Sequence, residues 1–306
     1  MVSLAQAHKK FIDHLKEKNR AQATVLAYGK DIDQLVEFLQ ELERAHVAQI
    51  SKDDIEAFLA KLLKGGYTPK SVSRKTNAFK TFFRFLKVNE YITDDPAVLV
   101  AHPKFESKPP RVLSETEYRA LRDAVRNDTR TYAIVELLLQ TGLRIGELSR
   151  LTTNDVKMDS KGRGELQVAS FNRHPMRSVP LNSRAQGALN AYLKERPSFA
   201  SAKGGSASGG KAAGGKPKSI FITRTGQPLL IRNIRSTIKR YLDLAGIENA
   251  TVNDLRHTFI AHHLQQGASL VLVSKIAGHR RLSTTEKYLE HLQITAPAEK
   301  MELAEL

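Results

Sequence analysis

Four side chains of this sequence have the chemistry needed to break and remake a phosphodiester bond. Arg144 and Arg256 are permanently charged, and a pair of guanidiniums can hold the two non-bridging oxygens of a phosphate under attack. His279 can donate a hydrogen bond to the same phosphate or carry a proton at cellular pH. Tyr288, nine residues further on, has a phenolic oxygen that can attack phosphorus and form a covalent link. These residue types predict phosphoryl transfer to a tyrosine, with two arginines stabilising the charge of the transition state.

A covalent intermediate of this kind would need neither ATP nor a metal ion, because it keeps the free energy of the phosphodiester for religation. The sequence also has no evident carboxylate cluster for Mg²⁺. His262 and His263 are neighbours, and adjacent residues on a helix diverge by about 100°, so a paired metal site is not expected there. We therefore expect no cofactor and no metal.

The composition favours a polyanionic partner and excludes several other classes of protein. The 306 residues include 48 Lys and Arg against 32 Asp and Glu, which gives a formal net charge of +16 and a pI near 9.9. Nucleic acid is the simplest partner for such a chain. Without cysteine, neither a disulfide framework nor a Cys-ligated zinc site can form. No stretch approaches the roughly 18 apolar residues that span a bilayer, so we expect a soluble, cytoplasmic protein without a membrane partner.

The elements that must position these residues begin with a helical N-terminal part. Apolar residues recur at helical spacing over 4–15 and 24–42, with Thr24 as the expected N-cap of the second run. A third helix is expected from Ser51 to Gly65, and a fourth begins near Pro69. This fourth helix has a basic flank beside an apolar stripe. The flank and a later basic region supply the expected contacts to nucleic acid, namely Lys70, Arg74, Lys75, Lys80, Arg84, Arg232 and Arg235.

A proline-rich stretch at 101–112 ends this part of the chain and suits an extended linker. Beyond the linker, Ser114 and Glu117 form a capping box for one helix. A second and more continuously apolar helix ends at Thr141-Gly142. Short strands are expected at 165–171, 177–181 and 220–223.

The clusters around the four chemical side chains resemble the signature boxes of the tyrosine recombinase family, and in particular of Xer-type recombinases. In the C-terminal part they are Thr141 to Leu148, Asp254 to Phe259, and Gly278-His279 followed by Ser283-Thr284-Thr285 and Tyr288. The N-terminal part is similar as well, at Thr24-Val25-Leu26-Ala27-Tyr28 and Phe82-Phe83-Arg84-Phe85-Leu86. The resemblance covers nearly the whole chain.

The resemblance implies a mainly helical fold with a small β-sheet. A helical core-binding domain of the SAM-like type would cover 1–100, a linker 101–112, and an α+β catalytic domain 113–306. Within the last, the Gly-, Ser- and Lys-rich segment 201–218 predicts a flexible insertion, and the tail from Ala296 to Leu306 predicts a small docking helix.

The activity that the resemblance implies is site-specific recombination of double-stranded DNA. Tyr288 would expel a 5′ hydroxyl and form a 3′-phosphotyrosyl link. The implied partners are a DNA that carries a specific recombination site and further copies of this chain, assembled as a homotetramer on two such sites.

Two departures from the family pattern concern proton transfer. The family usually has a Lys in the turn between the second and third strands of the catalytic domain, where it can protonate the leaving hydroxyl. This chain has Asn172 or Arg173 at that point, with His174 as a further candidate. An arginine is a poor proton donor because its pKa lies above about 12. The family's His-x-x-Arg box begins here with Asn253, whose amide can hold a phosphate oxygen but cannot act as a base. Glu147, one helical turn from Arg144, is expected to orient the site.

Two alternative hypotheses stay open, and the departures motivate the first of them. One is a catalytically impaired relative that only binds or shapes DNA, which covalent cleavage would reject. The other is a type IB topoisomerase, which shares the chemistry and would relax plasmids that lack any specific site.

Overall fold

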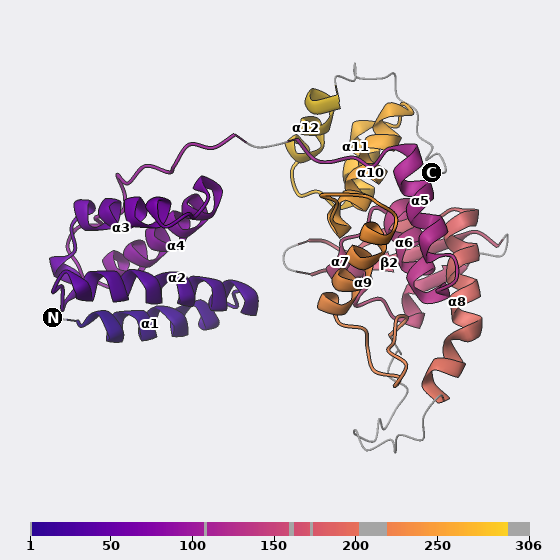
Figure 1. Ribbon diagram of the computed structural model, residues 1–306. Coiled ribbons are helices and arrows are strands. Elements are labelled where there is room, and N and C mark those ends of the chain that lie inside the picture. Colours follow the sequence, from indigo (N-terminus) through magenta and orange to yellow (C-terminus); the bar gives the residue numbers. More distant parts are fainter. Residues whose placement is uncertain (1, 107–108, 159–161, 172–173, 202–218, 293–306) are drawn as a thin grey trace. The chain divides into compact units, whose positions relative to one another are not determined.

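The chain folds as two compact units, Met1–Lys108 and Pro109–Leu306, in the computed structural model (Figure 1). The structure describes residues 2–106, 109–158, 162–171, 174–201 and 219–292, with only the backbone described at 197–201. Asn172, Arg173, nearly all of the expected insertion and the expected docking helix lie outside the described residues. The expected fold class, mainly helical with a small sheet, is confirmed.

The first unit is a bundle of four helices around an aromatic core. Serine and threonine caps begin two of the helices as the sequence predicts: Ser51 accepts from the backbone N–H of Asp54, and Thr68 accepts from that of Ser71. The predicted cap at Thr24 is wrong, because the second helix begins earlier, after Ala21, which makes no side-chain cap bond. The helices are α1 (Leu4–Glu17), α2 (Gln22–Glu41), α3 (Lys52–Lys64) and α4 (Pro69–Val88), with a short 3-10 turn at Val47–Gln49.

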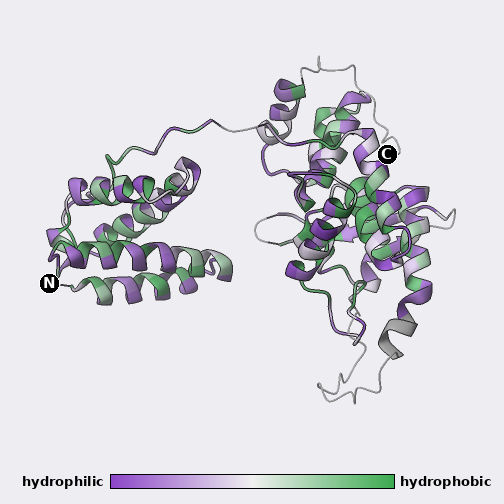
Figure 2. Ribbon diagram, in the orientation of Figure 1, coloured by the Kyte–Doolittle hydropathy of each residue, from purple (hydrophilic) through white to green (hydrophobic). Residues whose placement is uncertain are grey.

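The apolar stripe predicted for α4 is confirmed as the centre of this bundle. Its side chains are buried, and the rings of Phe82 and Phe11 pack edge to face with their centroids 5.2 Å apart. The hydropathy colouring shows the apolar residues of the four helices alternating with polar ones along each helix (Figure 2). The stripe consists of Val72, Phe79, Phe82, Phe83 and Leu86.

The second unit packs helices around a three-stranded antiparallel sheet. The strands lie in the order β1-β2-β3, and Leu166 of the middle strand pairs with Val179 of β3. The strands are β1 (Val156–Met158), β2 (Gly164–Val168) and β3 (Arg177–Leu181). The helices are α5 (Glu115–Val125), α6 (Thr129–Thr141), α7 (Ile145–Leu148), α8 (Ser183–Ser201), α9 (Ile231–Leu244), α10 (Val252–Gln265), α11 (Leu270–Ala277) and α12 (Ser283–Leu292), with a 3-10 turn at Thr153–Asp155.

The prediction of a strand at 220–223 is wrong. The sheet consists of β1, β2 and β3, and β1 was not predicted. The segment 220–223 makes only isolated bridges, one of them between Ile222 and Pro228. Its apolar residues are buried against the helices instead, where Phe221 stacks on Tyr192 with ring centroids 5.3 Å apart. A short buried apolar run has the same sequence pattern whether it forms a strand or packs against helices without joining a sheet.

Two predicted helix ends of this unit are confirmed, and they matter for the site. The capping box of Ser114 and Glu117 begins α5. The helix α6 ends at Gly142, which has a left-handed backbone with φ of 60°. None of the described helices combines the length and the apolar character that crossing a membrane needs.

Candidate active site

Arg144 stands in the turn between α6 and α7, and this turn depends on a glycine. A Cβ on Gly142 would lie 2.3 Å from the ring of Phe259, so no other residue fits at the end of α6. Two residues later, Arg144 precedes α7, and its Nη2 donates to the carbonyl oxygen of Gly278 at 2.9 Å. The guanidinium is thereby fixed against the end of α11, although a third of its side chain stays exposed.

Glu147 holds this arginine and a second one. The Glu147 Oε1 accepts from Nη1 of Arg144 at 3.1 Å, and both of its carboxylate oxygens accept from Arg177 at 2.9 Å. Burial alone would raise the pKa of Glu147, but the hydrogen bonds from Arg177 and from the backbone N–H of Arg144 lower it to about 2. The carboxylate is therefore ionised at any physiological pH, as expected for a residue that orients the site.

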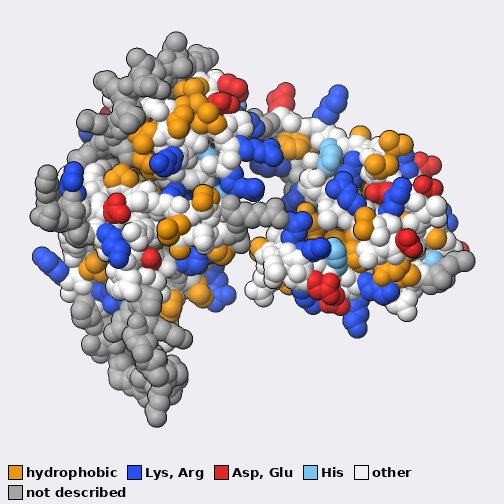
Figure 3. Space-filling model, turned by 180° about the vertical axis from the view of Figure 1, so that it is seen from behind, with side chains coloured by type: hydrophobic (Ala, Val, Ile, Leu, Met, Phe, Trp, Pro, Cys, Tyr) orange, Lys and Arg blue, Asp and Glu red, His pale blue; other side chains and the backbone are white. Residues whose placement is uncertain are grey.

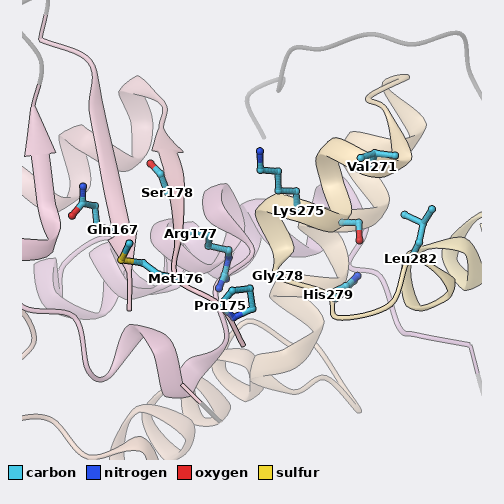
Figure 4. A pocket seen from close by; sticks show the side chains of 11 residues that line it. Gln167, Pro175, Met176, Arg177, Ser178, Val271, Lys275, Gly278, His279 and Leu282 are labelled. Carbon is cyan, nitrogen blue, oxygen red and sulfur yellow. The ribbon is translucent and has the colours of Figure 1, made fainter. Parts of the chain in front are cut away.

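Arg177 comes from the core side of β3 and ties the sheet to the end of α11. Its Nε donates to the carbonyl oxygen of Ile276 at 2.7 Å. Gly278 ends α11 with φ of 68°, and a Cβ there would lie 2.7 Å from Cζ of Arg177. Figure 4 shows Arg177 directed from its strand toward the turn that holds Gly278 and His279. The contact between Arg177 and Gly278 therefore joins β3 to the end of α11.

Arg256 projects from α10 and is 8% exposed. It donates through Nη1 to the carbonyl oxygen of Gly142. Burial first, and the charge of Arg144 second, lower the pKa of Arg256 to about 9, which leaves the side chain charged at neutral pH. Among the described residues, no carboxylate lies within ion-pair distance of it.

His279 follows the glycine that ends α11. Its Nδ1 lies 2.7 Å from Oγ1 of the fully buried Thr285. Burial, together with the nearby charges of Arg256 and Arg144, lowers the pKa of His279 to about 3. The imidazole is therefore neutral in the free protein and can donate only one hydrogen bond from its ring.

Tyr288 lies on α12 with its ring close to two imidazoles. Its ring is stacked with that of His279 at a centroid distance of 6.5 Å and meets that of His257 edge to face at 6.0 Å. The residue is 6% exposed. Burial raises the pKa of Tyr288, and the charge of Arg256 acts in the opposite direction. The phenol keeps its proton at neutral pH, so an attack by its oxygen requires a proton acceptor.

Four of the residues predicted for catalysis line one pocket of about 460 Å³. They are Arg144, Glu147, Asn253 and Arg256, together with His174, whose pKa is lowered by burial and by Arg144. His279 lines an adjoining pocket of about 890 Å³ with Arg177 and Gly278 (Figure 4). Within the described ranges, no three His, Asp or Glu residues lie together as a metal ion would require.

Three residues of this region were not among the predicted site residues. His257 and Arg150 line the smaller pocket, and the guanidinium of Arg150 stacks at 3.3 Å from the ring centroid of Phe171. Arg177 had a signal in the sequence, since it alternates with the buried Val179 and Leu181 and so lies on the core face of its strand. A charge on such a face needs a buried partner.

The predicted contacts to nucleic acid divide into exposed and internally paired side chains. Lys75 is 5% exposed, and its Nζ donates to Asp31 at 2.8 Å and to Gln34 at 2.6 Å. Arg74 is more exposed but also donates to Asp31, at 2.6 Å and 2.9 Å. Lys75 is therefore not available to a phosphate. Lys70, Arg84, Arg232 and Arg235 are exposed, and Lys80 is partly exposed with a bond to the carbonyl of Val98. Figure 3 shows Lys and Arg side chains spread over the visible face of each unit.

Comparisons with known proteins find family models, sequences and solved structures that are similar to this chain. The family model described as "Phage integrase family" matches residues 111–293, and that of the "Phage integrase, N-terminal SAM-like domain" matches 9–90. The tyrosine recombinase XerC of Roseiflexus castenholzii is 31% identical over 285 residues, which cover 91% of this chain and 86% of the relative.

Two solved structures share the fold. One is a lambda integrase tetramer bound to a Holliday junction, with a TM-score of 0.72, 18% identity and coverage of 92% of this chain and 78% of that one. The other is the XerH site-specific recombinase bound to a palindromic difH substrate in a post-cleavage complex. It has a TM-score of 0.73, 19% identity and coverage of 95% of this chain and 82% of that one.

Proposed function

This chain belongs to the phage integrase family and is a tyrosine recombinase, and we propose that Tyr288 is its nucleophile and that Arg144 and Arg256 hold the phosphate it attacks. The enzyme cleaves and rejoins DNA, as the resemblance predicted. Its substrate is double-stranded DNA that carries a specific site, and its intermediate is a 3′-phosphotyrosyl link.

The observation that carries these assignments is a buried cation in an open pocket. A charge as buried as that of Arg256 costs free energy unless an anion joins it, and the described residues offer no carboxylate partner. Arg144 lines the same pocket, and Tyr288 lies close enough to Arg256 for that charge to affect the pKa of the phenol. A phosphodiester bound in this pocket would supply the negative charge that Arg256 lacks as a partner, and it would lie beside the nucleophile.

The remaining assignments follow from the same geometry. His279 would donate its remaining ring N–H to a non-bridging oxygen, since it is neutral in the free protein. Asn253 would hold a phosphate oxygen through its amide from the rim of the pocket. Glu147 would keep both Arg144 and Arg177 in position. His174, Asn172 and Arg173 belong to the turn in which the family usually has a Lys, and we propose that this turn approaches the leaving 5′ oxygen.

The DNA would be held by both units, each through its own basic side chains. Lys70, Lys80 and Arg84 of α4 and Arg232 and Arg235 of α9 are the proposed phosphate and base contacts. We propose a homotetramer on two sites, which is supported by the structure of a lambda integrase tetramer bound to a Holliday junction. We also propose a cytoplasmic location, because DNA lies in that compartment in bacteria such as Roseiflexus castenholzii, whose XerC is similar to this chain.

The test is covalent trapping on DNA. The chain's own site is first recovered by sequencing the DNA that the protein selects from random duplexes. A nicked suicide duplex with this site is then incubated with wild type, Tyr288→Phe and, as a matched control, Tyr241→Phe, in EDTA and without ATP. We expect wild type and the control to give an adduct that survives denaturing electrophoresis, and Tyr288→Phe to bind the duplex without forming one. If wild type and Tyr288→Phe give the same pattern, the nucleophile assignment is wrong.

A further inference from the structure

The attack by Tyr288 releases a proton, and the structure has to supply a group that takes it. Burial raises the pKa of this phenol, so the tyrosinate is scarce at neutral pH. The family's usual histidine is Asn253 here, and an amide cannot accept a proton as a base. A substitute must therefore lie near the tyrosine ring.

Of the two imidazoles beside Tyr288, His279 is poorly suited to this task. Its Nδ1 is engaged with Thr285 at 2.7 Å. The charges of Arg256 and Arg144 oppose a further positive charge on its ring and contribute to its pKa of about 3. A general base works best when its pKa lies near the working pH, so His279 fits the role of a neutral hydrogen-bond donor better.

His257 has the geometry that the proton acceptor needs. It lies on α10 one helical turn after Asn253, so the two side chains share a face of the helix, and both line the pocket of Arg144 and Arg256. Its ring meets that of Tyr288 edge to face, with centroids 6.0 Å apart. It therefore shares a helix face with the position that the family histidine would occupy, and its ring contacts that of the nucleophile.

The ring of His257 also lies beside a carboxylate. Its Nδ1 is buried, makes no hydrogen bond of normal geometry with the described residues, and lies 3.2 Å from Oδ1 of Asp254, a distance at which a protonated ring forms an ion pair; 29% of the side chain is exposed. The exposed edge is thus the one that carries Nε2. Asp254 is itself fixed, because its Oδ2 accepts from the backbone N–H of Thr251 at 2.7 Å and from Oγ1 of the same residue at 3.0 Å.

Asp254 remains ionised beside this ring. Burial would raise the pKa of Asp254, but the contacts to His257 and Thr251 lower it. A carboxylate in this position stabilises the imidazolium that forms when the ring takes a proton, which is the function of the aspartate in Ser-His-Asp triads.

We propose that His257 is the proton acceptor for Tyr288, oriented by Asp254, and that it replaces the missing histidine at position 253; this inference rests on the proposed function. As Oη of Tyr288 bonds to phosphorus, its proton passes to Nε2 of His257, directly or through one water. The bond between phosphorus and the 5′ oxygen breaks, and that oxygen leaves with the electron pair and takes a proton from water. In religation each step runs in reverse, and His257 returns the proton to the tyrosine.

The test measures the pH dependence of single-turnover adduct formation on the suicide duplex. With wild type we expect the rate to rise with pH and then to level off. With His257→Gln we expect a fall of about 10²-fold at pH 7 and a rate that still climbs about tenfold per pH unit up to pH 9, because only spontaneously ionised phenol then attacks.

The groups that face His257 and titrate or carry charge are Asp254 of its own helix, Tyr288 of α12, Arg144, Glu147 and Arg150 of the α7 region, Arg256 and His174.

Two further variants separate proton transfer from a structural effect. His279→Gln should lower the rate at every pH and keep the levelling of the wild type, since it removes a phosphate contact. Asn253→His, introduced into His257→Gln, should restore at least tenfold of the lost rate, which a folding defect would not allow. Band shifts at pH 7 should show binding within about threefold of wild type for His257→Gln and for the double variant.

Several results would overturn the inference. A wild-type rate and pH profile in His257→Gln would exclude the residue as acceptor, and so would a loss that Asn253→His leaves unchanged. If wild type itself binds its site and forms no adduct, the proposed function fails and this inference fails with it. An adduct in wild type with no effect of residue 257 would overturn the inference alone.

Discussion

Replacing Glu147 with glutamine tests how the two arginines at the site are held. In the folded protein the pKa of Glu147 falls from an ordinary 4.5 to about 2, and each pKa unit corresponds to about 1.4 kcal/mol. The ionised carboxylate therefore contributes about 3 kcal/mol to the stability of the second unit. Breaking a buried ion pair by removing one partner typically costs about 3 to 5 kcal/mol, because the other charge stays buried and unpaired. Here that charge would be Arg177. We expect Glu147→Gln to lower the unfolding free energy by about 3 kcal/mol at pH 7.

The pH dependence of this loss has a definite sign. The pKa of Glu147 is lowered by folding, so its contribution is complete above pH 4.5 and is lost as the pH falls from about 4.5 toward 2. Glutamine does not titrate. The difference in unfolding free energy between wild type and variant should therefore stay constant from pH 7 to pH 5 and then shrink by about 1.4 kcal/mol per pH unit.

The measurement is urea unfolding of the full chain by circular dichroism, with one transition fitted for each unit. Glu136→Gln is the matched control, since Glu136 is fully buried in the same unit and pairs with Arg122 at 2.6 Å, away from the pocket. Both variants should weaken the same transition and leave the other unchanged. Only Glu147→Gln should slow adduct formation, by about 10²-fold, because Arg144 loses an anchor. A difference below 1 kcal/mol at pH 7, or one that does not shrink in acid, would refute this account of the pair.

Two further predictions concern the glycine at the end of α11 and the basic side chains of α4. Gly278→Ala should destabilise the second unit by about 2 kcal/mol or more, through its left-handed backbone and the contact with Arg177, whereas Gly187→Ala in α8 should cost nothing in the same urea titration. Arg84→Ala should reduce by about one the slope of log affinity against log salt in DNA-binding anisotropy. Lys75→Met should leave that slope unchanged and lower the unfolding free energy of the first unit. If Arg84→Ala also leaves the slope unchanged, Arg84 does not belong to the DNA interface.

Local rules were enough to predict much of the fold. The caps at Ser51 and Ser114 and the glycine that ends α6 are set by bonds within one turn of chain, so short patterns reveal them. The error at Thr24 has the same origin. A threonine at the start of an apolar periodic run looks like a cap, but the helix can begin earlier when the preceding residues tolerate helical backbone.

Long-range pairing was outside the reach of these patterns. The basic flank of α4 predicted Lys75 as a phosphate contact, yet Asp31, more than 40 residues earlier, takes its charge inside the bundle. The spacing of α4 does separate Lys75 from Lys70, since Lys75 lies three residues after Val72 and so on the buried stripe, but it does not reveal the carboxylate that pairs with it. In the same way, His257 stands directly after Arg256 in the sequence, and its position next to Tyr288 depends on how α10 packs on α12.

The positions of the three arginines show how the site keeps its charge available. Arg144 and Arg177 donate to the last carbonyls of α11, and Arg256 donates to the carbonyl of the glycine that ends α6. These carbonyls have no partner within their own helices and carry the negative end of the helix dipole, so they attract a guanidinium strongly. A carbonyl oxygen fixes the position of a cation without cancelling its unit charge, whereas a carboxylate would do both. With Glu147 as the one carboxylate that the described residues bring into this cluster, positive charge remains for a phosphate. Burial and the same uncancelled charge lower the pKa of His279 and keep it neutral, which is why proton transfer has to move to a histidine that has a carboxylate beside it.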